Sequence, residues 1–543
     1  MPNQSLPLQE IIARITAPKL DAAEKSPSIL SGLGTMQSLN QRLVNYPVFD
    51  FINYNLRGIG QVIFVNNPLS GLLILLALFI QSPWVGLMSL LGVISSTVAA
   101  IALKLDKDTI RNGIFGYNGI LVGAALATFG AGGNGDWNLA WAVAVIIFSA
   151  LTTAMMKSFG VWWATTFKSP PLTLPFNILT LLFLGLVTLI PQPLFKLGSA
   201  SAPATPIEAL EIPRLLTSLP VDFGQVFLAD KLIAGVLILL AVAICTPLGA
   251  IVGLLGGILG VVAGIILGII PDTLYAGLWG YNSVLAAMAI SGIFYAPNLR
   301  SFLVGGASAF VSALAIPVLG LLAKPLVLPV LTLPFCVVTI ACFVILQRSL
   351  SSLVPVALHA VTSPEEHRQR YLIAKEVISN FRRQLETAIE GNSSNILFYQ
   401  ASEATKGDLR YVFDAIDTDR SRELSTKELA NYLMTADSHT SEEELNYLFK
   451  SMDRDGSGTI DFEEFGELML RHQRLMARYE EFTTYFLPID ADKDNAIDIQ
   501  EMNTAMSSVN EPPLTREEID FLQQRANSLS FTWNQFIELL LLT

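Results

Sequence analysis

The stretch Leu56–Gly71 reads L-R-G-I-G-Q-V-I-F-V-N-N-P-L-S-G and places an arginine, a glutamine and an asparagine pair at the start of a long apolar region. A weaker copy follows at Asp222–Gly235, D-F-G-Q-V-F-L-A-D-K-L-I-A-G. The Gln61-Val62 pair returns there as Gln225-Val226, 164 positions later. Polar residues at matching places in apolar sequence indicate a shared polar site in two related segments.

Two further landmarks repeat in the same order. Gly116-Tyr117-Asn118 returns as Gly280-Tyr281-Asn282, again 164 positions later. Thr173-Leu174-Pro175-Phe176 returns as Thr332-Leu333-Pro334-Phe335 after 159 positions. Three landmarks in one order predict that the first two-thirds of the chain form two homologous halves.

Composition separates this region from the rest of the chain. The 543 residues are 52% hydrophobic and only 15% charged, which is typical of a membrane protein. Residues 1–390 carry 21 Lys+Arg against 17 Asp+Glu, whereas residues 391–543 carry 13 against 29, a balance of −16. We therefore predict a near-neutral membrane body and an acidic soluble tail, and no nucleic-acid partner, because a basic binding surface is missing.

Ten apolar segments predict the membrane crossings. They are 69–81, 85–103, 117–129, 139–156 and 172–190 in the first half, and 232–245, 248–270, 281–295, 302–322 and 326–346 in the second. Several are shorter than the ~20 residues that a spanning helix needs. Short, Gly- and Pro-interrupted spans at matching places indicate broken or re-entrant helices in two inverted halves.

The predicted fold is an all-α polytopic membrane protein in the lipid bilayer, with about ten transmembrane helices, two tilted or re-entrant pore helices and a C-terminal soluble EF-hand domain. The expected regions are an N-terminal tail 1–45, the halves 46–200 and 201–350, an amphipathic linker helix region 351–404 and the EF-hand domain 405–543. Ten crossings place both termini on one side. Basic residues after the last span make that side cytoplasmic, and the expected location is the plasma membrane.

The predicted spans contain no charged residue and no histidine, which argues against proton or sodium coupling and for passive passage of a neutral solute. The glutamines offer a carbonyl and an amide, and the threonines a hydroxyl. Apolar walls are expected from Phe64, Tyr117, Leu121, Tyr281 and Leu285. Such a slot fits a small planar molecule rich in N–H groups. The repeated Thr-Leu-Pro-Phe has a second interpretation, in which the hydroxyl only relieves a proline kink.

The runs Gly60–Gly71, Gly116–Gly123 and Leu172–Asn177 resemble the urea transporter family, over about Tyr46–Gln347. The resemblance implies a homotrimer in which each protomer conducts urea like a channel. It also implies which residues line the path. The implied urea sites are at Gln61, Val62, Phe64, Gln225 and Val226, and the implied constriction is at Thr173, Thr332, Leu121 and Leu285. The second half departs from this pattern at Leu228, opposite Phe64, and at Cys336, opposite Asn177.

The acidic tail contains one complete calcium-binding loop. Residues Asp453–Glu464 supply oxygen ligands at Asp453, Asp455, Ser457, Thr459, Asp461 and Glu464, with Gly458 at the turn. This spacing is that of an EF-hand loop, in which hard oxygens surround Ca²⁺. Calcium is therefore the expected cofactor.

Two flanking loops keep the same spacing. The ligands expected in the first are Asp417, Asp419, Ser421, Glu423, Ser425 and Glu428, and in the third Asp490, Asp492, Asp494, Ala496, Asp498 and Glu501. Arg422 occupies the turn position of the first loop and Asn495 that of the third. Because asparagine tolerates positive φ better than arginine, we expect the third loop to bind calcium better than the first. Residues 530–536 resemble the end of a fourth loop without its ligands.

A helix is expected at 364–390, because apolar residues from Tyr371 to Ala388 recur at spacings of three and four. This helix could pack on the tail domain, serve as a target for an EF-hand pair, or lie on the membrane surface. The tail itself has two interpretations, a calcium sensor that modulates conduction or a calcium buffer and docking module. The solute also has alternatives in ammonia, water and short amides. An enzyme is not expected, because all four histidines lie outside the membrane body and no nucleophile–base set is present.

Overall fold

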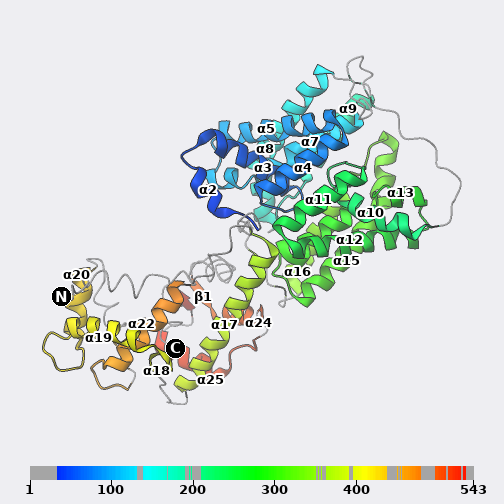
Figure 1. The fold of residues 1–543 in the computed structure, drawn as a ribbon. Helices are drawn as coiled ribbons and strands as arrows, with labels where there is room; N and C mark the ends of the chain where they lie inside the picture. The colour runs from blue at the N-terminus through cyan, green and yellow to red at the C-terminus, as the bar shows by residue number, and fades with distance from the viewer. Residues whose placement is uncertain are drawn as a thin grey trace. The chain divides into compact units, whose positions relative to one another are not determined.

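The computed structural model describes residues 34–130, 138–167, 169–189, 210–349, 362–389, 396–436, 455–477, 496–508, 511–526 and 530–532, together with the single residues Phe195, Leu197, Leu353, Val356, Phe449 and Asp453. It divides into two compact units. The membrane unit lies within Ser26–Gln369, and the C-terminal unit includes Arg370–Thr543. Each unit is considered separately below (Figure 1).

The membrane unit consists of helices whose order repeats. The first half contains α2 (Gln37–Leu43), α3 (Pro47–Gln61), α4 (Pro68–Gln81), α5 (Pro83–Ala102), α6 (Lys107–Arg111), α7 (Tyr117–Phe129), α8 (Leu139–Phe167) and α9 (Leu174–Leu189). The second half contains α10 (Ile212–Gln225), α11 (Leu232–Cys245), α12 (Pro247–Ile266), α13 (Pro271–Tyr275), α14 (Tyr281–Met288), the π-helix η4 (Ala289–Ile293), α15 (Leu299–Ala323), the 3₁₀ helix η5 (Lys324–Leu326) and α16 (Leu333–Ser349). From α3 and α10 onward, the two halves have matching helices.

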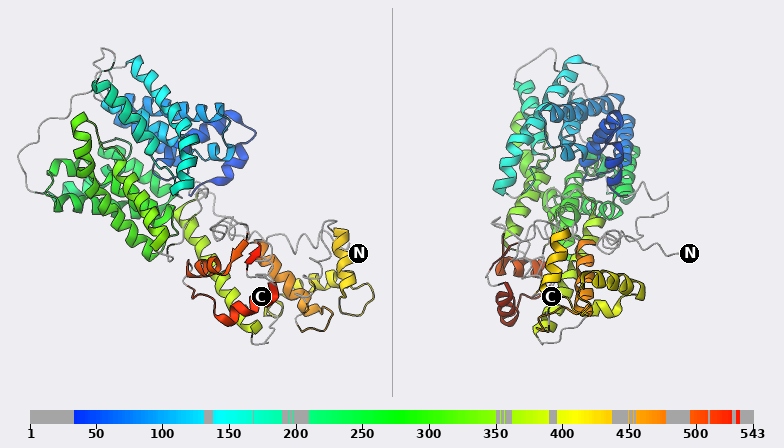
Figure 2. Two further views of the ribbon diagram at one scale, coloured as in Figure 1. Left: turned by 180° about the vertical axis from the view of Figure 1, so that it is seen from behind. Right: turned by 90° about the vertical axis from the view of Figure 1, so that its left-hand side faces the viewer.

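Ten of these helices coincide with the predicted spans. Among the described residues, four segments are long and apolar enough to cross a membrane: Pro83–Ala102, Leu139–Phe167, Pro247–Ile266 and Leu299–Leu326. Six shorter apolar segments flank them, Pro68–Gln81, Tyr117–Phe129, Leu174–Leu189, Leu232–Cys245, Tyr281–Ile293 and Leu333–Leu346. Long and short segments alternate in the same order in both halves. The two bundles pack side by side, with α4 of the first half against α11 of the second (Figures 1 and 2).

Glycines allow the helices within each half to approach closely. A Cβ on Gly92 of α5 would lie 2.2 Å from the Gly119 carbonyl oxygen on α7. A Cβ on Gly256 of α12 would lie 2.7 Å from the Ser283 carbonyl oxygen on α14. No side chain fits at such distances, so small residues are required where these helices cross.

The second half starts with a helix that contains a proline. α10 begins at Ile212 and runs through Pro220. Proline normally interrupts a helix, because it has no N–H and its ring crowds the preceding turn. The Cβ of a side chain at Gly235 would lie 2.3 Å from the Pro220 carbonyl oxygen, so tight packing against α11 accompanies this proline.

The C-terminal unit is built from helices joined by calcium-type loops. Its described elements are α17 (Pro364–Ile389, which begins in the membrane unit), α18 (Ile396–Gln400), α19 (Glu403–Ile416), α20 (Thr426–Ala436), α22 (Phe462–Ala477), β1 (Ala496–Asp498), α24 (Ile499–Ser508), α25 (Arg516–Ala526) and β2 (Ser530–Thr532). The first and second loops pair through a β-bridge between Leu424 and Ile460. The end of the third loop, β1, pairs antiparallel with residues 530–532 of β2. Ile497 lies opposite Phe531 in this pair. The unit therefore contains two paired-loop arrangements.

Candidate functional site

The two repeated glutamines make the same contact in the two halves. The Gln61 amide donates from Nε2 to the Asn112 carbonyl at 2.9 Å, and Gln225 Nε2 donates to the Ala276 carbonyl at 2.8 Å. Each acceptor lies 51 residues after its glutamine. The amide nitrogen thus holds the side chain in place, and the side-chain oxygen is the acceptor that each glutamine can offer to a solute N–H group.

The repeated tyrosines are held by a second matched pair of bonds. Tyr117 Oη donates to the Leu172 carbonyl at 2.8 Å, and Tyr281 Oη donates to the Leu331 carbonyl at 2.5 Å. Both leucines adopt left-handed backbone angles, with φ of 51° and 49°. This conformation is unusual for a residue other than glycine, so each tyrosine secures a strained turn beside its half's Thr-Leu-Pro-Phe segment.

The repeated asparagines cap the helices that follow those turns. Phe176 N donates to Asn118 Oδ1 at 3.1 Å, and Phe335 N donates to Asn282 Oδ1 at 3.1 Å. These amides lie in the first turns of α9 and α16, where backbone N–H groups have no partner within the helix. Each asparagine therefore satisfies a helix start from a neighbouring helix of the same half.

The two repeated threonines meet where the halves join. Their hydroxyl oxygens, Thr173 Oγ1 and Thr332 Oγ1, lie 2.7 Å apart, and Thr173 Oγ1 lies 3.1 Å from Cys336 Sγ. Asn177 Nδ2 donates at 2.8 Å both to Thr332 Oγ1 and to the Thr173 carbonyl. These hydroxyl contacts join the two halves. The interpretation in which each threonine only relieves a local proline kink does not account for them.

A cavity of about 150 Å³ lies beside these groups. It brings together five predicted path residues, Gln61, Val62, Phe64, Tyr117 and Thr173. The rest of the lining is Asn66, Ile114, Met156, Pro170, Pro171, Leu172, Ile293, Phe294, Phe335 and Thr362. Cavities of about this size hold a molecule as large as benzene. The cavity therefore has room for a small solute, between one glutamine, two threonines and aromatic rings.

The other predicted path residues lie outside this cavity. Leu121 and Leu285 are fully buried in the hydrophobic core of the membrane unit, as is Val226. Gln225 and Tyr281 take part in the second-half copies of the contacts described above. The structure thus gathers five of the six predicted first-half residues around one cavity and gives Gln225 and Tyr281 contacts that match those of Gln61 and Tyr117.

Sequence reasoning assigned no role to Arg57, which is completely buried in α3. Its guanidinium donates to the carbonyls of Thr35, Met36 and Asn66 at 2.7–2.8 Å, and also to the side chains of Asn53 and Asn66. These acceptors join the chain before α2 to the loop that follows Gln61. The polar residues around Arg57 in the quoted stretch were the available signal, but their partners are distant in sequence.

The first two calcium-type loops gather carboxylates. Asp417, Asp419 and Glu428 place one oxygen each within 4.8 Å of one another, and so do Asp453, Asp455 and Glu464. Equivalent amides bind the first carboxylate of each loop, with Arg422 N on Asp417 Oδ2 at 2.9 Å and Gly458 N on Asp453 Oδ2 at 2.8 Å. A cluster of hard oxygens in this arrangement suits Ca²⁺.

The two loops differ at the positions that require a left-handed backbone. Gly456 and Gly458 have φ of 71° and 83°, and the residues at the same places in the first loop, Arg420 and Arg422, have φ of 61° and 71°. Glycine adopts these angles freely, whereas arginine does so at a cost of about 1–2 kcal/mol per residue. The first loop therefore has the calcium-loop shape and carries backbone strain that the second avoids.

The last carboxylate of the first loop is prepared to bind a cation. Burial alone would raise the pKa of Glu428, but hydrogen bonds from Ser425, Asp419 and Thr418 outweigh it and lower the pKa to about 2. Glu428 is thus ionised at neutral pH, and calcium binding need not remove a proton from it.

The third loop is described in part. Ala496, Asp498 and Glu501 lie in the structure, and Asp490, Asp492 and Asp494 lie outside the described residues, as does Asn495. Asp498 N donates to Glu501 Oε2 at 2.9 Å, which matches the bond from Asp461 N to Glu464 Oε2 at 3.1 Å in the second loop. The end of the third loop thus has the geometry of the complete loop.

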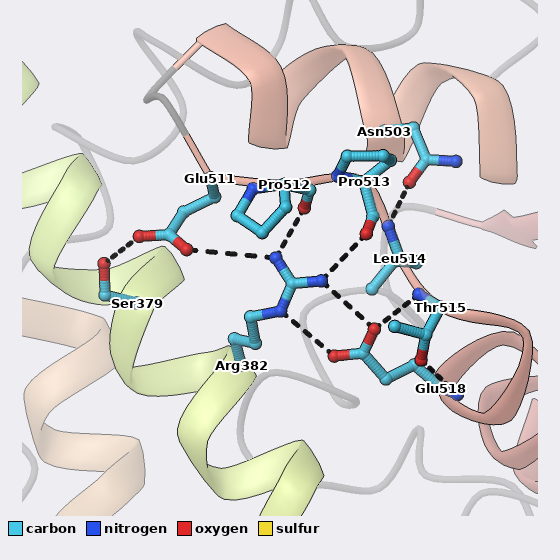
Figure 3. A network of polar contacts seen from close by, with 9 residues as sticks. All are labelled: Ser379, Arg382, Asn503, Glu511, Pro512, Pro513, Leu514, Thr515 and Glu518. Carbon is cyan, nitrogen blue, oxygen red and sulfur yellow. Dashed lines mark hydrogen bonds and ion pairs between the residues drawn. The ribbon is translucent and has the colours of Figure 1, made fainter.

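Arg382 of α17 lies in a cluster of acceptors within the C-terminal unit (Figure 3). Its guanidinium forms a two-pronged pair with the Glu518 carboxylate at 3.1 Å and donates to the carbonyls of Pro512 and Pro513. The nearby Ser379 hydroxyl donates to Glu511 at 2.7 Å. Arg382 is nearly buried, so α17 is held against the segment that connects the third loop's helix α24 to α25.

Together, the paired helices, the polar slot and the calcium-type loops define a class: a polytopic membrane transport protein with an attached calcium-binding domain. Comparison with known proteins agrees. The model of the urea transporter family matches residues 52–347, and that of an EF-hand domain pair matches residues 406–470. The chain belongs to the urea transporter family.

Curated relatives match both parts of the chain. Urea transporter 1 of Capra hircus is 33% identical over 368 residues, which cover 66% of this chain and 93% of the relative. Urea transporter 1 of Rattus norvegicus is 35% identical over 350 residues, covering 63% and 89%. Calcium-binding protein SPEC 2C of Strongylocentrotus purpuratus is 28% identical over 115 residues, covering 21% of this chain and 75% of the relative.

Proposed function

We propose that this protein conducts urea passively across a membrane, through a slot lined by the repeated residues of both halves. The observation that carries the proposal is the cavity beside the Thr173–Thr332 contact. It combines hydrogen-bonding groups with aromatic and apolar walls. A planar amide can stack against the walls while its N–H groups find oxygen acceptors, and an ion would lose its hydration without compensation.

The matched contacts suggest how the slot selects its solute. Gln61 and Gln225 are held by their amides and can present oxygens, and the hydroxyls of the two threonines meet where the halves join. Urea has four N–H donors and one carbonyl acceptor, so it can exchange partners along such a series. Water and ammonia have no planar face that could stack on the aromatic walls, so we rank them below urea as candidate solutes.

Stopped-flow urea efflux from liposomes tests the solute. We expect saturable flux that exceeds that of protein-free liposomes and that discriminates urea from larger amides. Thr173→Val and Thr332→Val should each lower the flux, while Thr128→Val, on the same α7 as Tyr117 but outside the cavity lining, should leave it unchanged. Flux of ammonia or water without urea would refute the proposed solute.

We propose further that calcium binding by the C-terminal unit regulates conduction. Calcium would supply a positive charge that draws the loop carboxylates together. The support is α17, a single helix whose residues 364–369 fall within the membrane unit and whose Arg382 is held by Glu518 of the C-terminal unit. A helix that is shared in this way favours a sensor over a detached calcium buffer or docking module.

Urea flux in low and high buffered calcium, on the side of the C-terminal unit, tests this regulation. We expect flux to change with calcium in the wild type and to stop changing when Glu464→Gln and Glu501→Gln are combined. Calcium binding to the second and third loops, measured separately by calorimetry, must be lost in the same variant, while the first loop with Glu428 is left intact. Calcium binding with unchanged flux would assign the unit to buffering or docking.

The family also suggests an assembly and a location for this protein. We propose a homotrimer in the plasma membrane with two inverted halves per protomer and both termini in the cytoplasm. Mass measurement in detergent tests the trimer. Protease access to a C-terminal tag in sealed, oriented vesicles tests the side, and digestion only after permeabilisation of right-side-out vesicles is the expected result.

A further inference from the structure

One residue of the cavity comes from outside the region that matches the urea transporter family. Thr362 follows the last apolar helix, α16, and lies beyond the matched residues 52–347, yet it lines the cavity with Gln61 and Phe294. Its hydroxyl oxygen is buried and has no hydrogen-bond partner among the described residues. A buried hydroxyl beside a solute-sized cavity usually acquires a partner, because leaving it unpaired costs free energy.

The residues after Thr362 are anchored in the membrane unit. His367, which was expected outside the membrane body, is completely buried within the membrane unit, and its Nδ1 lies 2.8 Å from the Gly292 carbonyl oxygen. Pro364 packs on Gly292 so closely that a Cβ there would lie 2.8 Å from the proline Cβ. Gly292 belongs to the π-helix η4, in which the backbone hydrogen bonds shift by one residue. Such segments are frequent at functional sites.

Two glutamates extend the anchor to other helices of the same unit. Glu365 Oε1 accepts from Leu248 N at 2.7 Å and from the Thr246 hydroxyl at 3.0 Å. These groups form the N-terminus of α12, where a negative charge is favourable. Glu366 Oε1 accepts from the Thr35 hydroxyl at 3.0 Å. The start of α17 is therefore held by three parts of the membrane unit: η4, the N-terminus of α12, and Thr35.

A further contact lies on the chain before Thr362. Val356 N donates to the Phe294 carbonyl at 2.8 Å, and Val356 is buried. Phe294 lines the cavity and packs edge-on against Phe64, with ring centroids 5.8 Å apart. The segment that carries Thr362 thus contacts the cavity wall on one side of the threonine and the anchor on the other.

We propose that Thr362 is a solute-contacting residue of the urea path, held in the cavity wall by the anchored first turn of α17. Its hydroxyl can accept from a urea N–H or donate to the urea oxygen. The inference rests on the proposed urea conduction. It adds a specificity residue from the chain segment that leads to the calcium-binding unit, so a displacement of the α17 start changes the path itself.

Thiol modification tests whether Thr362 faces the path. Thr362→Cys, the matched control Thr128→Cys and the wild type are reconstituted and treated with a small neutral methanethiosulfonate. We expect urea flux in Thr362→Cys to fall about tenfold, because the added group occupies the cavity, and flux in the other two proteins to remain. The wild type controls for Cys245, Cys336 and Cys342. Full flux after confirmed labelling, or a thiol that the reagent cannot reach, overturns the proposal.

A second variant tests the hydroxyl without a reagent. Thr362→Val keeps the side-chain shape, and we expect the urea concentration for half-maximal flux to rise about three- to tenfold, the effect of one lost hydrogen bond. Glu365→Gln should produce a smaller change in the same direction by loosening the anchor. An unchanged half-maximal concentration in Thr362→Val contradicts the contact. Absence of urea flux in the wild type would instead refute the proposed function.

Discussion

The two halves of the membrane unit agree where they would shape a solute path and differ where other parts of the chain attach. The glutamine, tyrosine and asparagine bonds repeat with nearly equal geometry. By contrast, α7 of the first half is an α-helix to its end, whereas α14 of the second half continues as the π-helix η4. The contacts beside the proposed solute path therefore repeat in both halves. The halves differ where the N- and C-terminal segments are attached.

Arg57 is the strongest difference between the halves, because Val221 stands 164 positions later. Arg57→Met leaves three buried carbonyls without their donor and should lower the free energy of unfolding by about 4–6 kcal/mol. Val221→Ala should cost only about 1–2 kcal/mol, the loss of two buried methyl groups. Thermal unfolding in detergent measures both. Equal losses would mean that the Arg57 bonds are not required for folding.

Asn177 and Cys336 form the second difference, at the threonine contact. Asn177→Ala removes the donor to both threonines and should cost about 2–3 kcal/mol and lower urea flux about tenfold. Cys336→Ala removes one weak thiol contact and should cost about 1 kcal/mol. Flux and thermal stability together test this ranking. If Cys336→Ala lowered flux more than Asn177→Ala, the thiol would have to be the dominant group.

The tyrosines test the agreement between the halves. Tyr117→Phe leaves the Leu172 carbonyl without its donor and should cost about 1–2 kcal/mol. In Tyr281→Phe the Leu331 carbonyl keeps a second donor, Asn282 Nδ2 at 3.2 Å, so a smaller decrease in thermal stability is expected. Equal decreases would show that the asparagine bond does not compensate for the lost tyrosine.

The smallest expected effect concerns Phe64 and Leu228, which share left-handed φ of 62° and 58°. Phe64→Leu loses edge-on contacts with Phe294 and Phe335, worth about 1 kcal/mol. We expect a higher urea concentration for half-maximal flux and little loss of stability. Leu228→Phe is the reciprocal change, and it should lower that concentration if the second half offers equal space. An unchanged half-maximal concentration in both variants would exclude an aromatic role at this position.

Much of the organisation could be predicted from local sequence. Repeated polar landmarks in apolar sequence predicted the two halves, and the ten spans agree with the observed helices within a few residues at most ends; the main exceptions are α8, which extends to Phe167, and α16, which begins at Leu333. The oxygen spacing of Asp453–Glu464 predicted a calcium loop. These features depend on neighbouring residues, because helix formation and loop coordination are set over a few turns of chain.

Tertiary structure decided which distant groups meet. No local pattern relates the residues that meet in these contacts. They include the carbonyls that accept from Gln61 and Tyr117, and the acceptors around Arg57. The same holds for the passage of α10 through Pro220. Thr362 is a single hydroxyl after a mostly apolar run, and no local pattern marks it as a cavity residue. Only packing of the α17 start against η4 and α12 places it in the cavity, because burial and hydrogen bonding depend on the folded surroundings rather than on the residue type.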